Sequence, residues 1–286
     1  MPKISVLTPI YSPQELHLRI AIESILNQTF KDFEFIILND CPEDIKSESI
    51  VYSYKDERII YLKNEQNLGI SASRNKLISL AKGKYLAIFD HDDISLPLRL
   101  ATQNEYLDTH KDCGVVGSFY TTISKNKNQI KTYPINHDEI KKAMLSGMSV
   151  LHTSLMIRKS ILTKHNISYK QQFFPAEDYA FCGDLIDKTT FHNIPEVLVK
   201  YRNHKQNTSS KNSELMRTQD LAIKKILRQK HNKLWQEIEV NKTTITRSKL
   251  FNIIPTITTK EKANLKKYYL LGFIPFYTTR TKTTYI

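Results

Sequence analysis

Short apolar runs alternate with helix-like segments over the N-terminal third of the chain, and this alternation limits the fold more than any other feature. Each run is strand-sized and rich in Ile, Val, Leu or Phe, and a segment with helical spacing of apolar residues follows it. Such a succession builds a mostly parallel α/β sheet with right-handed crossovers. The predicted strands are Ile4–Pro9, Phe33–Leu38, Arg58–Leu62 and Tyr85–Phe89, and the predicted helices between them are Leu16–Leu26, Pro42–Tyr54 and Ser71–Ala81.

Chemically useful residues stand at the end of each of these strands. The first strand leads to Pro9 and Tyr11, the second to Asp40, the third to the loop Asn64–Gly69, and the fourth to Asp90–Asp93. Open α/β sheets bind ligands at the edge formed by the carboxyl ends of their strands. We therefore expect one site at that edge.

The segment Phe89-Asp90-His91-Asp92-Asp93 carries three carboxylates directly after the fourth strand. Crowded carboxylates repel one another and lose hydration unless a cation neutralises them. A divalent metal that holds a phosphate-bearing ligand would account for the carboxylates and for their place at the sheet edge. The alternative is a solvated loop whose aspartates cap the helix that begins near Leu96-Pro97-Leu98.

The pattern becomes irregular beyond residue 112. Strands are predicted at Val115–Tyr120, Val150–Ile157 and Glu196–Tyr201, and Glu177-Asp178 opens a helix after Gln172–Pro175. A polar stretch around Asn207–Ser210 marks a soft boundary. The sequence thus predicts one domain over residues 1–210, with halves of about 1–112 and 113–210, and a basic helical region over 211–286.

Charge separates the C-terminal quarter from the rest of the chain. The net charge is +13, and residues 215–286 hold 15 of the 42 Lys and Arg residues but only 4 of the 29 Asp and Glu residues. Leu215–Val240 has amphipathic spacing, and lysines precede the aromatic-rich run Tyr268–Tyr277. A basic helix next to an apolar patch suits an anionic membrane surface. A plain solvated helix stays open, and no base-reading motif supports a nucleic acid partner.

Other sequence features exclude several protein classes. No apolar run approaches the roughly 18 residues of a membrane span, and Met1–Ile10 is typical of a first strand, not of a signal peptide. Cys41, Cys113 and Cys182 are odd in number and lack metal-type spacing. We expect a reducing, cytoplasmic setting.

Taken together, the motifs resemble those of family 2 glycosyltransferases, which are inverting, metal-dependent enzymes with the GT-A fold. The resemblance covers about three quarters of the chain, from Ile4 to Ser210. Each motif is weak alone, but their order and spacing are specific. The matching segments are Ser5–Tyr11, Asp40, Asn67–Asn75, Phe89–Asp93 as the Asp-x-Asp motif, Glu177-Asp178 as the acidic pair, and Tyr201–His204 at the end of the catalytic domain.

The resemblance implies that a hexose moves from a nucleotide sugar, expected to be UDP-linked, to a glycan or lipid-linked acceptor in lipopolysaccharide, lipooligosaccharide or capsule synthesis. Mn²⁺ or Mg²⁺ would stabilise the charge of the leaving diphosphate. Asp92 is the expected metal ligand, and the imidazole of His204 is a candidate second ligand, with a structural role as its alternative. Asp90 would orient the ribose or a metal-bound water, whereas Asp93 fits a helix N-cap better.

The other strand ends receive roles from the same resemblance. Asp40 suits a hydrogen bond to the edge of uracil, with Tyr11 stacked on the base and Pro9 shaping the floor. Arg74 would contact the phosphates or brace Asp90. A turn aspartate, a surface tyrosine and an ordinary helix-surface arginine are the structural alternatives. The expected donor-binding residues are Pro9, Tyr11, Asp40, Asn67, Gly69, Arg74, Asp90 and His91.

Inversion needs a base on the sugar face opposite the leaving group, where it takes the proton of the acceptor hydroxyl. The family places its base in the acidic pair, so Asp178 is the expected catalytic base, with Glu177 in orientation or acceptor binding. Acidic residues at a helix start also complement the helix dipole, so a capping role stays open. His152 is expected either to border the sugar pocket or to be a satisfied core histidine.

Two further classes stay open. A nucleotidyltransferase acting on a sugar phosphate shares the sheet and the acidic metal site, but usually has a Gly-rich basic loop where this chain has Tyr11–Glu15. A non-catalytic nucleotide- or glycan-binding module is the other class. A lipid-linked acceptor and the basic tail together favour a peripheral position on the inner face of the cytoplasmic membrane. The oligomeric state is left open.

Overall fold

The computed structural model describes residues 1–123, 128–203, 212–250, 265–267 and 278–280, with side chains up to Asn241. The chain forms two compact units, Met1–Lys230 and His231–Ile286. The second unit contains helix α10 (Asn232–Leu250) and the short antiparallel strands β10 (Leu265–Lys267) and β11 (Thr278–Arg280). All other described elements belong to the first unit.

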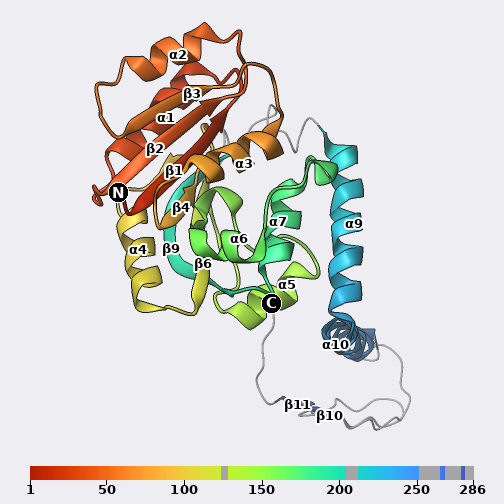
Figure 1. Ribbon diagram of the computed structural model, residues 1–286. Coiled ribbons are helices and arrows are strands. Elements are labelled where there is room, and N and C mark those ends of the chain that lie inside the picture. Colours follow the sequence, from red (N-terminus) through yellow and green to blue (C-terminus); the bar gives the residue numbers. More distant parts are fainter. Residues whose placement is uncertain (124–127, 204–211, 251–264, 268–277, 281–286) are drawn as a thin grey trace. The chain divides into compact units, whose positions relative to one another are not determined.

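The first unit is built on a mixed nine-stranded sheet with helices packed against it (Figure 1). Its strand order is β3-β2-β1-β4-β8-β6-β9-β5, and β7 pairs with β6. The strands are β1 (Ile4–Ile10), β2 (Phe33–Asn39), β3 (Ile59–Lys63), β4 (Tyr85–Ile88), β5 (Ile94–Ser95), β6 (Cys113–Ile123), β7 (Gln129–Lys131), β8 (Met156–Arg158) and β9 (Thr190–Arg202). The helices are α1 (Glu15–Leu26), α2 (Ile45–Tyr52), α3 (Ile70–Leu80), α4 (Arg99–Thr109), α5 (His137–Met144), α6 (Lys159–His165), α7 (Glu177–Leu185) and α9 (Ser213–Lys230), with short 3-10 helices η1 (His152–Ser154) and η2 (Gln171–Phe173).

The N-terminal half of the sheet confirms the expected parallel arrangement. Strand β1 pairs in parallel with β2 and β4, and β2 pairs in parallel with β3. Every residue of β1 and β2 is buried, because helices cover both faces. Alternate residues such as Ile4 and Val6 pack with α1, α2 and α4. The ends of these strands therefore meet at one edge.

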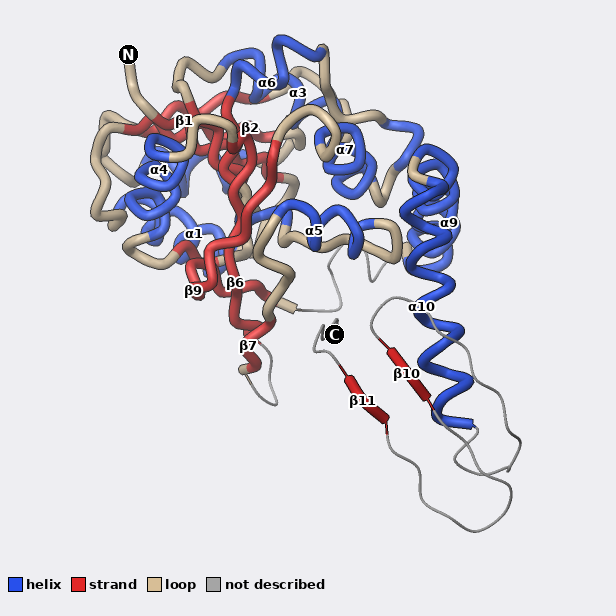
Figure 2. The backbone as a smooth tube through the Cα atoms, turned by 90° about the horizontal axis from the view of Figure 1, so that it is seen from below, coloured by secondary structure: helices blue, strands red, loops and turns tan. Residues whose placement is uncertain are grey.

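The second half of the sheet is mixed. Strand β8 lies antiparallel between β4 and β6. Strands β6 and β9, which lie side by side in Figure 2, run parallel along most of their length. The short strand β5 leaves the Asp-rich loop and pairs with β9, with Ile94 opposite Lys200. This pairing brings the end of β9 next to the Asp-rich loop.

Two predicted elements are wrong. The strand expected over Val150–Ile157 begins only at Met156, because residues 152–154 form η1. There Ser154 Oγ donates to the carbonyl of Leu151 at 2.7 Å, a local bond that competes with strand pairing. The single helix expected over Leu215–Val240 is two helices, α9 and α10, divided at His231. The polar run 228–233 offers no apolar face to bury at that point.

Helix α9 packs against α7 of the same unit. Leu227 is 4% exposed, and a Cβ added at Gly183 would lie 3.1 Å from Leu227 Cδ2, so the two backbones approach closely. Arg228 Nε also donates to the carbonyl of Leu145 at 2.8 Å. The domain boundary expected near residue 210 stays a prediction.

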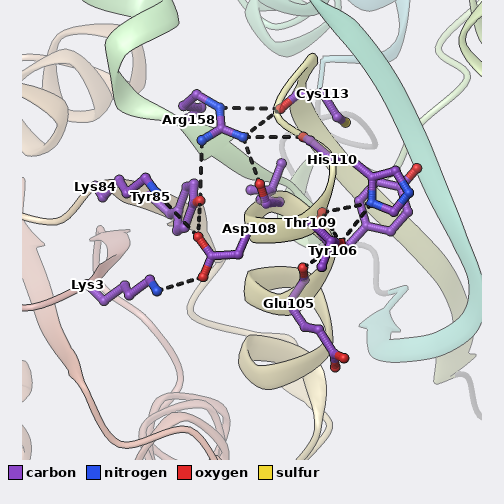
Figure 3. Close-up of polar contacts among 11 residues, drawn as sticks. Lys3, Lys84, Tyr85, Glu105, Tyr106, Asp108, Thr109, His110, Cys113 and Arg158 are labelled. Carbon is purple, nitrogen blue, oxygen red and sulfur yellow. Dashed lines mark hydrogen bonds and ion pairs between the residues drawn. The ribbon is translucent and has the colours of Figure 1, made fainter.

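A charged cluster fastens α4 to the sheet (Figure 3). The Asp108 carboxylate lies 2.6 Å from Lys3 Nζ and accepts a hydrogen bond of 2.7 Å from Tyr85 Oη. Arg158 of β8 donates from Nη2 to the carbonyl of Leu107 at 2.8 Å, near the C-terminal end of the helix. A cation at this end complements the helix dipole. Among the described residues, no helix has the length and apolar character that crossing a membrane requires.

Candidate active site

The loop between β3 and α3 is folded around Asp40. Asp40 Oδ1 accepts hydrogen bonds from Asn64 Nδ2 at 2.7 Å and from the backbone N–H of Leu68 at 2.9 Å, and Oδ2 accepts from the N–H of Gly69 at 2.9 Å. Asn67 Oδ1 also accepts from the N–H of Gly69, whose φ of 81° favours glycine. A carboxylate has about four lone-pair sites, and these contacts with the loop use three of those of Asp40.

Tyr11 and Asp40 lie side by side at the ends of β1 and β2. The N–H of Asp40 donates to the carbonyl of Ile10 at 2.9 Å. Pro9 is buried within β1 opposite Leu38, and the Tyr11 side chain is 56% exposed. An exposed ring beside the Asp40 loop is suitably placed for base stacking, which stays a prediction.

Arg74 links the Asp-rich loop to α7. Its Nη2 donates to Asp90 Oδ1 at 3.0 Å, and its Nη1 lies 3.7 Å from Glu177 Oε1. The Arg74 side chain is 10% exposed, and its Cζ lies 5.5 Å from the ring centroid of Tyr169. Burial opposes the charge, but Asp90, Tyr169 and Glu177 together raise the pKa of Arg74 above its usual value. Arg74 is therefore a buried cation that braces Asp90, and not a surface charge; its contact with phosphate stays a prediction.

The acidic pair opens α7 beside this cation. Burial raises the pKa of both Glu177 and Asp178, while the charge of Arg74 opposes the rise. Glu177 is 5% exposed, and its Oε2 has no hydrogen-bond partner among the described residues. Asp178 Oδ1 accepts from the N–H of Tyr179 at 2.7 Å, so one of its oxygens bonds to the first turn of the helix. A raised pKa makes either carboxylate a stronger base than an exposed one.

The Asp-rich loop is held by residues from two other segments. The N–H of Asp90 donates to Thr153 Oγ1 at 3.0 Å, the N–H of Arg202 to Asp93 Oδ1 at 2.8 Å, and Arg202 Nε to the carbonyl of Asp92 at 2.8 Å. Asp93 is 1% exposed, and burial, with the charges of Asp92 and Asp90, raises the pKa of Asp93 well above its usual value. These contacts fix the backbone from which the aspartates project.

The expected N-cap role of Asp93 is wrong. Helix α4 begins at Arg99, with Leu98 at the cap position, and β5 lies between Asp93 and that helix. Asp93 is instead a buried carboxylate bound to the end of β9.

The carboxylates of the Asp-rich loop fit a hard divalent cation that would take its remaining ligands from a diphosphate. Within the described ranges, no group of three or more His, Cys, Asp or Glu residues is arranged to hold a metal ion. Asp90 and Asp92 nevertheless offer carboxylate oxygens, and a cation there would offset the repulsion that raises the pKa of Asp93. Mg²⁺ is commonly bound by one or two carboxylates plus substrate phosphates, and carboxylates also suit Mn²⁺. His204 lies outside the described residues, so its predicted ligand role is not tested.

His152 has the contacts of a satisfied core histidine. It is 6% exposed, and its Nε2 lies 2.8 Å from Tyr169 Oη. Burial, with the nearby charge of Arg74, lowers the pKa of His152 well below its usual value, so the ring is neutral. Tyr169 in turn stacks on Phe181, with ring centroids 4.0 Å apart. His91 is partly buried in the Asp-rich loop, and its donor-binding role stays a prediction.

Sequence reasoning gave no role to Thr153 or Tyr169, which contact Asp90 and Arg74 respectively. Thr153 stands in an apolar run without a distinguishing pattern, and Tyr169 stands in a stretch without periodicity. The Asn75 side chain binds the backbone of Tyr169 twice: its Nδ2 donates to the Tyr169 carbonyl at 2.9 Å, and its Oδ1 accepts from the Tyr169 N–H at 2.8 Å. No local pattern in the sequence signals this long-range contact.

The site thus joins an acidic strand end, a buried arginine and a carboxylate pair at the edge of an α/β sheet. Comparison with known proteins agrees: the chain belongs to glycosyl transferase family 2, whose family model matches residues 5–166. The similarity of this chain to solved glycosyltransferase structures confirms the expected GT-A fold class.

Curated relatives extend over most of the chain. An uncharacterized glycosyltransferase of Methanocaldococcus jannaschii is 41% identical over 207 residues, covering 70% of this chain and 71% of that protein. The O-antigen biosynthesis glycosyltransferase WbnJ of Escherichia coli is 33% identical over 214 residues, covering 72% and 81%. The E. coli protein WfaP, named a UDP-Glc:alpha-D-GlcNAc-diphosphoundecaprenol beta-1,3-glucosyltransferase, is 26% identical over 237 residues, covering 82% and 90%.

Two solved structures share the fold. S. aureus TarS in complex with UDP-GlcNAc superposes with a TM-score of 0.63 at 18% identity, covering 76% of this chain and 65% of that one. A mannosyltransferase from Pyrobaculum calidifontis, in complex with GDP-Man and Mn²⁺, gives 0.58 at 14% identity, covering 78% and 63%. This chain spans less than two thirds of either, and identities this low show the fold alone.

Proposed function

We propose that this family 2 glycosyltransferase moves a hexose from a UDP-sugar, with inversion, to a glycan or lipid-linked oligosaccharide acceptor in cell-envelope polysaccharide synthesis. The observation that carries the proposal is the double contact of Arg74, which brings Asp90 of the Asp-rich loop and the Glu177-Asp178 pair to one place. A leaving diphosphate and a proton-accepting carboxylate must lie on opposite sides of the same sugar, and this arrangement supplies groups for both.

The donor and acceptor classes rest on relatives. WbnJ is named for O-antigen synthesis, WfaP is named for UDP-Glc and a diphosphoundecaprenol-linked acceptor, and the TarS structure holds UDP-GlcNAc. The mannosyltransferase structure with GDP-Man makes a GDP-sugar the competing donor.

Each residue of the site has a distinct part in this proposal. Asp92 would hold Mn²⁺ or Mg²⁺, which would supply charge stabilisation for the leaving diphosphate, and Asp90 would orient the ribose or a metal-bound water. Asp40 and Tyr11 receive the nucleoside. Asp178 accepts the proton of the attacking hydroxyl: burial makes its carboxylate more basic, and the neighbouring charge of Arg74 favours its ionised form.

The proposal extends to the domain organisation and to the membrane. Residues 1–210 form the catalytic domain, and the basic region after it holds the enzyme peripherally at the anionic inner face of the cytoplasmic membrane. Exposed Arg217 and Lys225 are available for such contact. Lys224 pairs with Asp220 at 2.6 Å and Lys230 with Asp187 at 2.7 Å, so these cations also serve the fold. The aromatic run 268–277 lies outside the described residues.

The variant Asp178→Asn tests the catalytic proposal. We expect transfer to fall by at least about 100-fold, the usual contribution of a general base. Donor affinity should persist, measured as thermal stabilisation by UDP-sugars with Mn²⁺. Asp184→Asn is the matched control, because Asp184 lies on the same helix but pairs with the partly exposed Lys170.

Three outcomes would contradict the proposal. Full transfer activity in Asp178→Asn would show that Asp178 is not the catalytic base. Stabilisation by nucleoside triphosphates but by no nucleotide sugar favours a nucleotidyltransferase. Donor binding without transfer or donor hydrolysis in the unaltered protein favours a binding module.

A further inference from the structure

Three tyrosines gather on the second half of the sheet, and the proposal above gives none of them a role. Tyr120 is on β6, Tyr201 is near the end of β9, and Tyr133 follows β7. The ring centroids of Tyr120 and Tyr133 are 5.9 Å apart, and those of Tyr120 and Tyr201 are 6.0 Å apart. All three residues are partly buried. We call them the Tyr cluster.

Strand register places Tyr120 and Tyr201 on one face of the sheet. Tyr120 pairs with Val199 of β9, and Tyr201 lies two residues farther along the same strand. Side chains two residues apart on a strand share a face, and diagonal neighbours are within reach of aromatic rings. Tyr120 also pairs with Lys131 at the end of β7, and Tyr133 follows that strand end with its ring centroid 5.9 Å from that of Tyr120.

The Tyr133 segment is held firmly to β9. Asn193 Nδ2 donates to the carbonyl of Pro134 at 2.7 Å, and the N–H of Asn193 donates to the carbonyl of Ile135 at 3.0 Å. A ring presented from a fixed backbone loses little freedom when it binds a ligand.

The Tyr cluster borders the Asp-rich loop of the candidate active site. Arg202, the residue after Tyr201, donates its N–H to Asp93 Oδ1 at 2.8 Å and its Nε–H to the carbonyl of Asp92 at 2.8 Å. The cluster is therefore joined through the end of β9 to the loop that carries the expected metal ligand. After burial and Tyr120, the charge of Asp178 also contributes to the raised pKa of the Tyr133 phenol, so the expected base is within electrostatic reach.

The chemistry of the cluster suits a sugar ring. A pyranose has an apolar face of C–H groups and a rim of hydroxyls, and tyrosine offers an aromatic face together with a hydroxyl that donates and accepts. The rings of Tyr120 and Tyr201 are inclined by 81°, and those of Tyr120 and Tyr133 by 31°. Rings that are inclined to one another can contact both a face and an edge of a pyranose, whereas parallel stacked rings would offer a single flat surface.

We infer that the Tyr cluster is the acceptor subsite, which binds the pyranose whose hydroxyl attacks the donor. This inference rests on the proposed function. In the step that it serves, the acceptor oxygen bonds to the anomeric carbon, its proton passes to the Asp178 carboxylate, and the bond from that carbon to the diphosphate oxygen breaks with its electron pair leaving on the diphosphate.

Saturation-transfer NMR on the full chain tests the subsite. The probes are the methyl glycosides of glucose, galactose and N-acetylglucosamine, with UDP and the diamagnetic Mg²⁺ present. We expect at least one glycoside to receive saturation, strongest on the C–H protons of one ring face. Tyr201→Ala and Tyr120→Ala should each weaken its affinity roughly tenfold, and Tyr201→Phe much less, since stacking persists.

Tyr52→Ala is the matched control. Tyr52 pairs with Tyr61 at 5.4 Å in an edge-on contact of the same kind, but on α2 and β3. This variant, and UDP affinity in every folded variant, should stay unchanged. Should Tyr120→Ala fail to fold, Tyr201→Ala near the end of β9 carries the test.

Several results would overturn the subsite. One is that no glycoside receives saturation from a protein that binds UDP. Another is that Tyr201→Ala leaves the glycoside affinity unchanged. A third is that Tyr201→Ala loses UDP affinity, which would assign the Tyr201 ring to the donor pocket. Failure of the proposed function looks different, because neither UDP nor any nucleotide sugar then binds. Glycoside binding that depends on Tyr201 would then assign sugar binding to the Tyr cluster but overturn its role as an acceptor subsite.

Discussion

Arg74 is a single side chain that contacts carboxylates from two distant segments. One guanidinium nitrogen binds Asp90 at 3.0 Å, and another lies 3.7 Å from Glu177. The planar fork of arginine presents several donors at fixed angles, whereas a lysine ammonium is one point charge on a flexible stem. Arginine therefore fixes the distance between the two carboxylates and also stabilises their negative charges.

Removal of this cation should shift the pH profile of transfer. The charge of Arg74 holds down the pKa of both Glu177 and Asp178 against burial. In Arg74→Met that pKa rises further, so the base is deprotonated only at higher pH. We expect the acid limb of kcat/KM to move to higher pH, and to move less in Arg74→Lys, which keeps the charge.

The measurement is kcat/KM for transfer across the pH range in which each variant stays folded. Arg19→Met is the control, because Arg19 pairs with Glu15 on an exposed helix face. An unshifted acid limb in Arg74→Met would show that neither carboxylate is the base.

The Asp108 carboxylate contributes to the attachment of helix α4 beside β1 and β4. Burial opposes ionisation of Asp108, but hydrogen bonds from Lys3, Tyr85 and Lys84 hold the pKa of Asp108 below its usual range. A carboxyl with a depressed folded-state pKa contributes stability above its unfolded pKa of roughly 4, and this contribution is lost as the pH falls toward the folded value.

We therefore expect Asp108→Asn to lower the free energy of unfolding by about 1–2 kcal/mol at neutral pH, because the site is partly exposed. The difference in unfolding free energy between Asp108→Asn and the unaltered protein should shrink below about pH 4. Urea unfolding at several pH values measures it, with the exposed Asp112→Asn as control. A difference that is constant with pH would show that the carboxylate charge does not matter there.

Helix α9 should be stabilised through one of its faces only. Leu227 is 4% exposed against α7, whereas the adjacent Ile226 is 48% exposed. Leu227→Ala should cost about 2–3 kcal/mol, and Ile226→Ala less than about 0.5 kcal/mol. Urea unfolding of both variants checks this, and equal effects would mean that α9 does not pack on α7 in solution.

Sequence patterns predicted the elements whose apolar residues repeat regularly. Strands β1, β2 and β4 and helix α1 lie within a residue or two of their expected bounds, because each is specified by its own spacing. Two segments differ from the predicted elements. A side-chain hydrogen bond favours the 3-10 helix over residues 152–154, and residues 228–233 lack the apolar contacts that would continue one helix. At the site, the rule for parallel strands brought Tyr11 and Asp40 together correctly.

Contacts made by the whole molecule were beyond such patterns. Glu177 stands more than a hundred residues after Arg74, and Arg202 a similar distance after Asp93, so only the folded sheet brings each pair together. The burial of Asp93 followed from the return of β9 beside β5, which no local signal announces.

The two compact units allow a prediction about truncation. The first unit ends at Lys230 and includes α9. A chain that ends after Lys230 should unfold cooperatively, with donor binding close to that of the full chain. A chain that ends after Ser210 should be less stable, because it lacks Ile223 and Leu227, which are 3% and 4% exposed. Thermal unfolding with and without UDP–Mn²⁺ compares the two chains, and equal stability would show that α9 does not stabilise the first unit.

The fastening of the β3–α3 loop to Asp40 has a consequence for the thermodynamics of donor recognition. Three hydrogen bonds already fix residues 64–69 in the free protein. A nucleotide that meets this loop spends little binding energy on ordering it, so the conformational entropy of the segment is lost during folding and not during association. Calorimetry of donor binding should then show a heat-capacity change set by the apolar surface that the nucleotide covers, without the larger change that accompanies coupled folding.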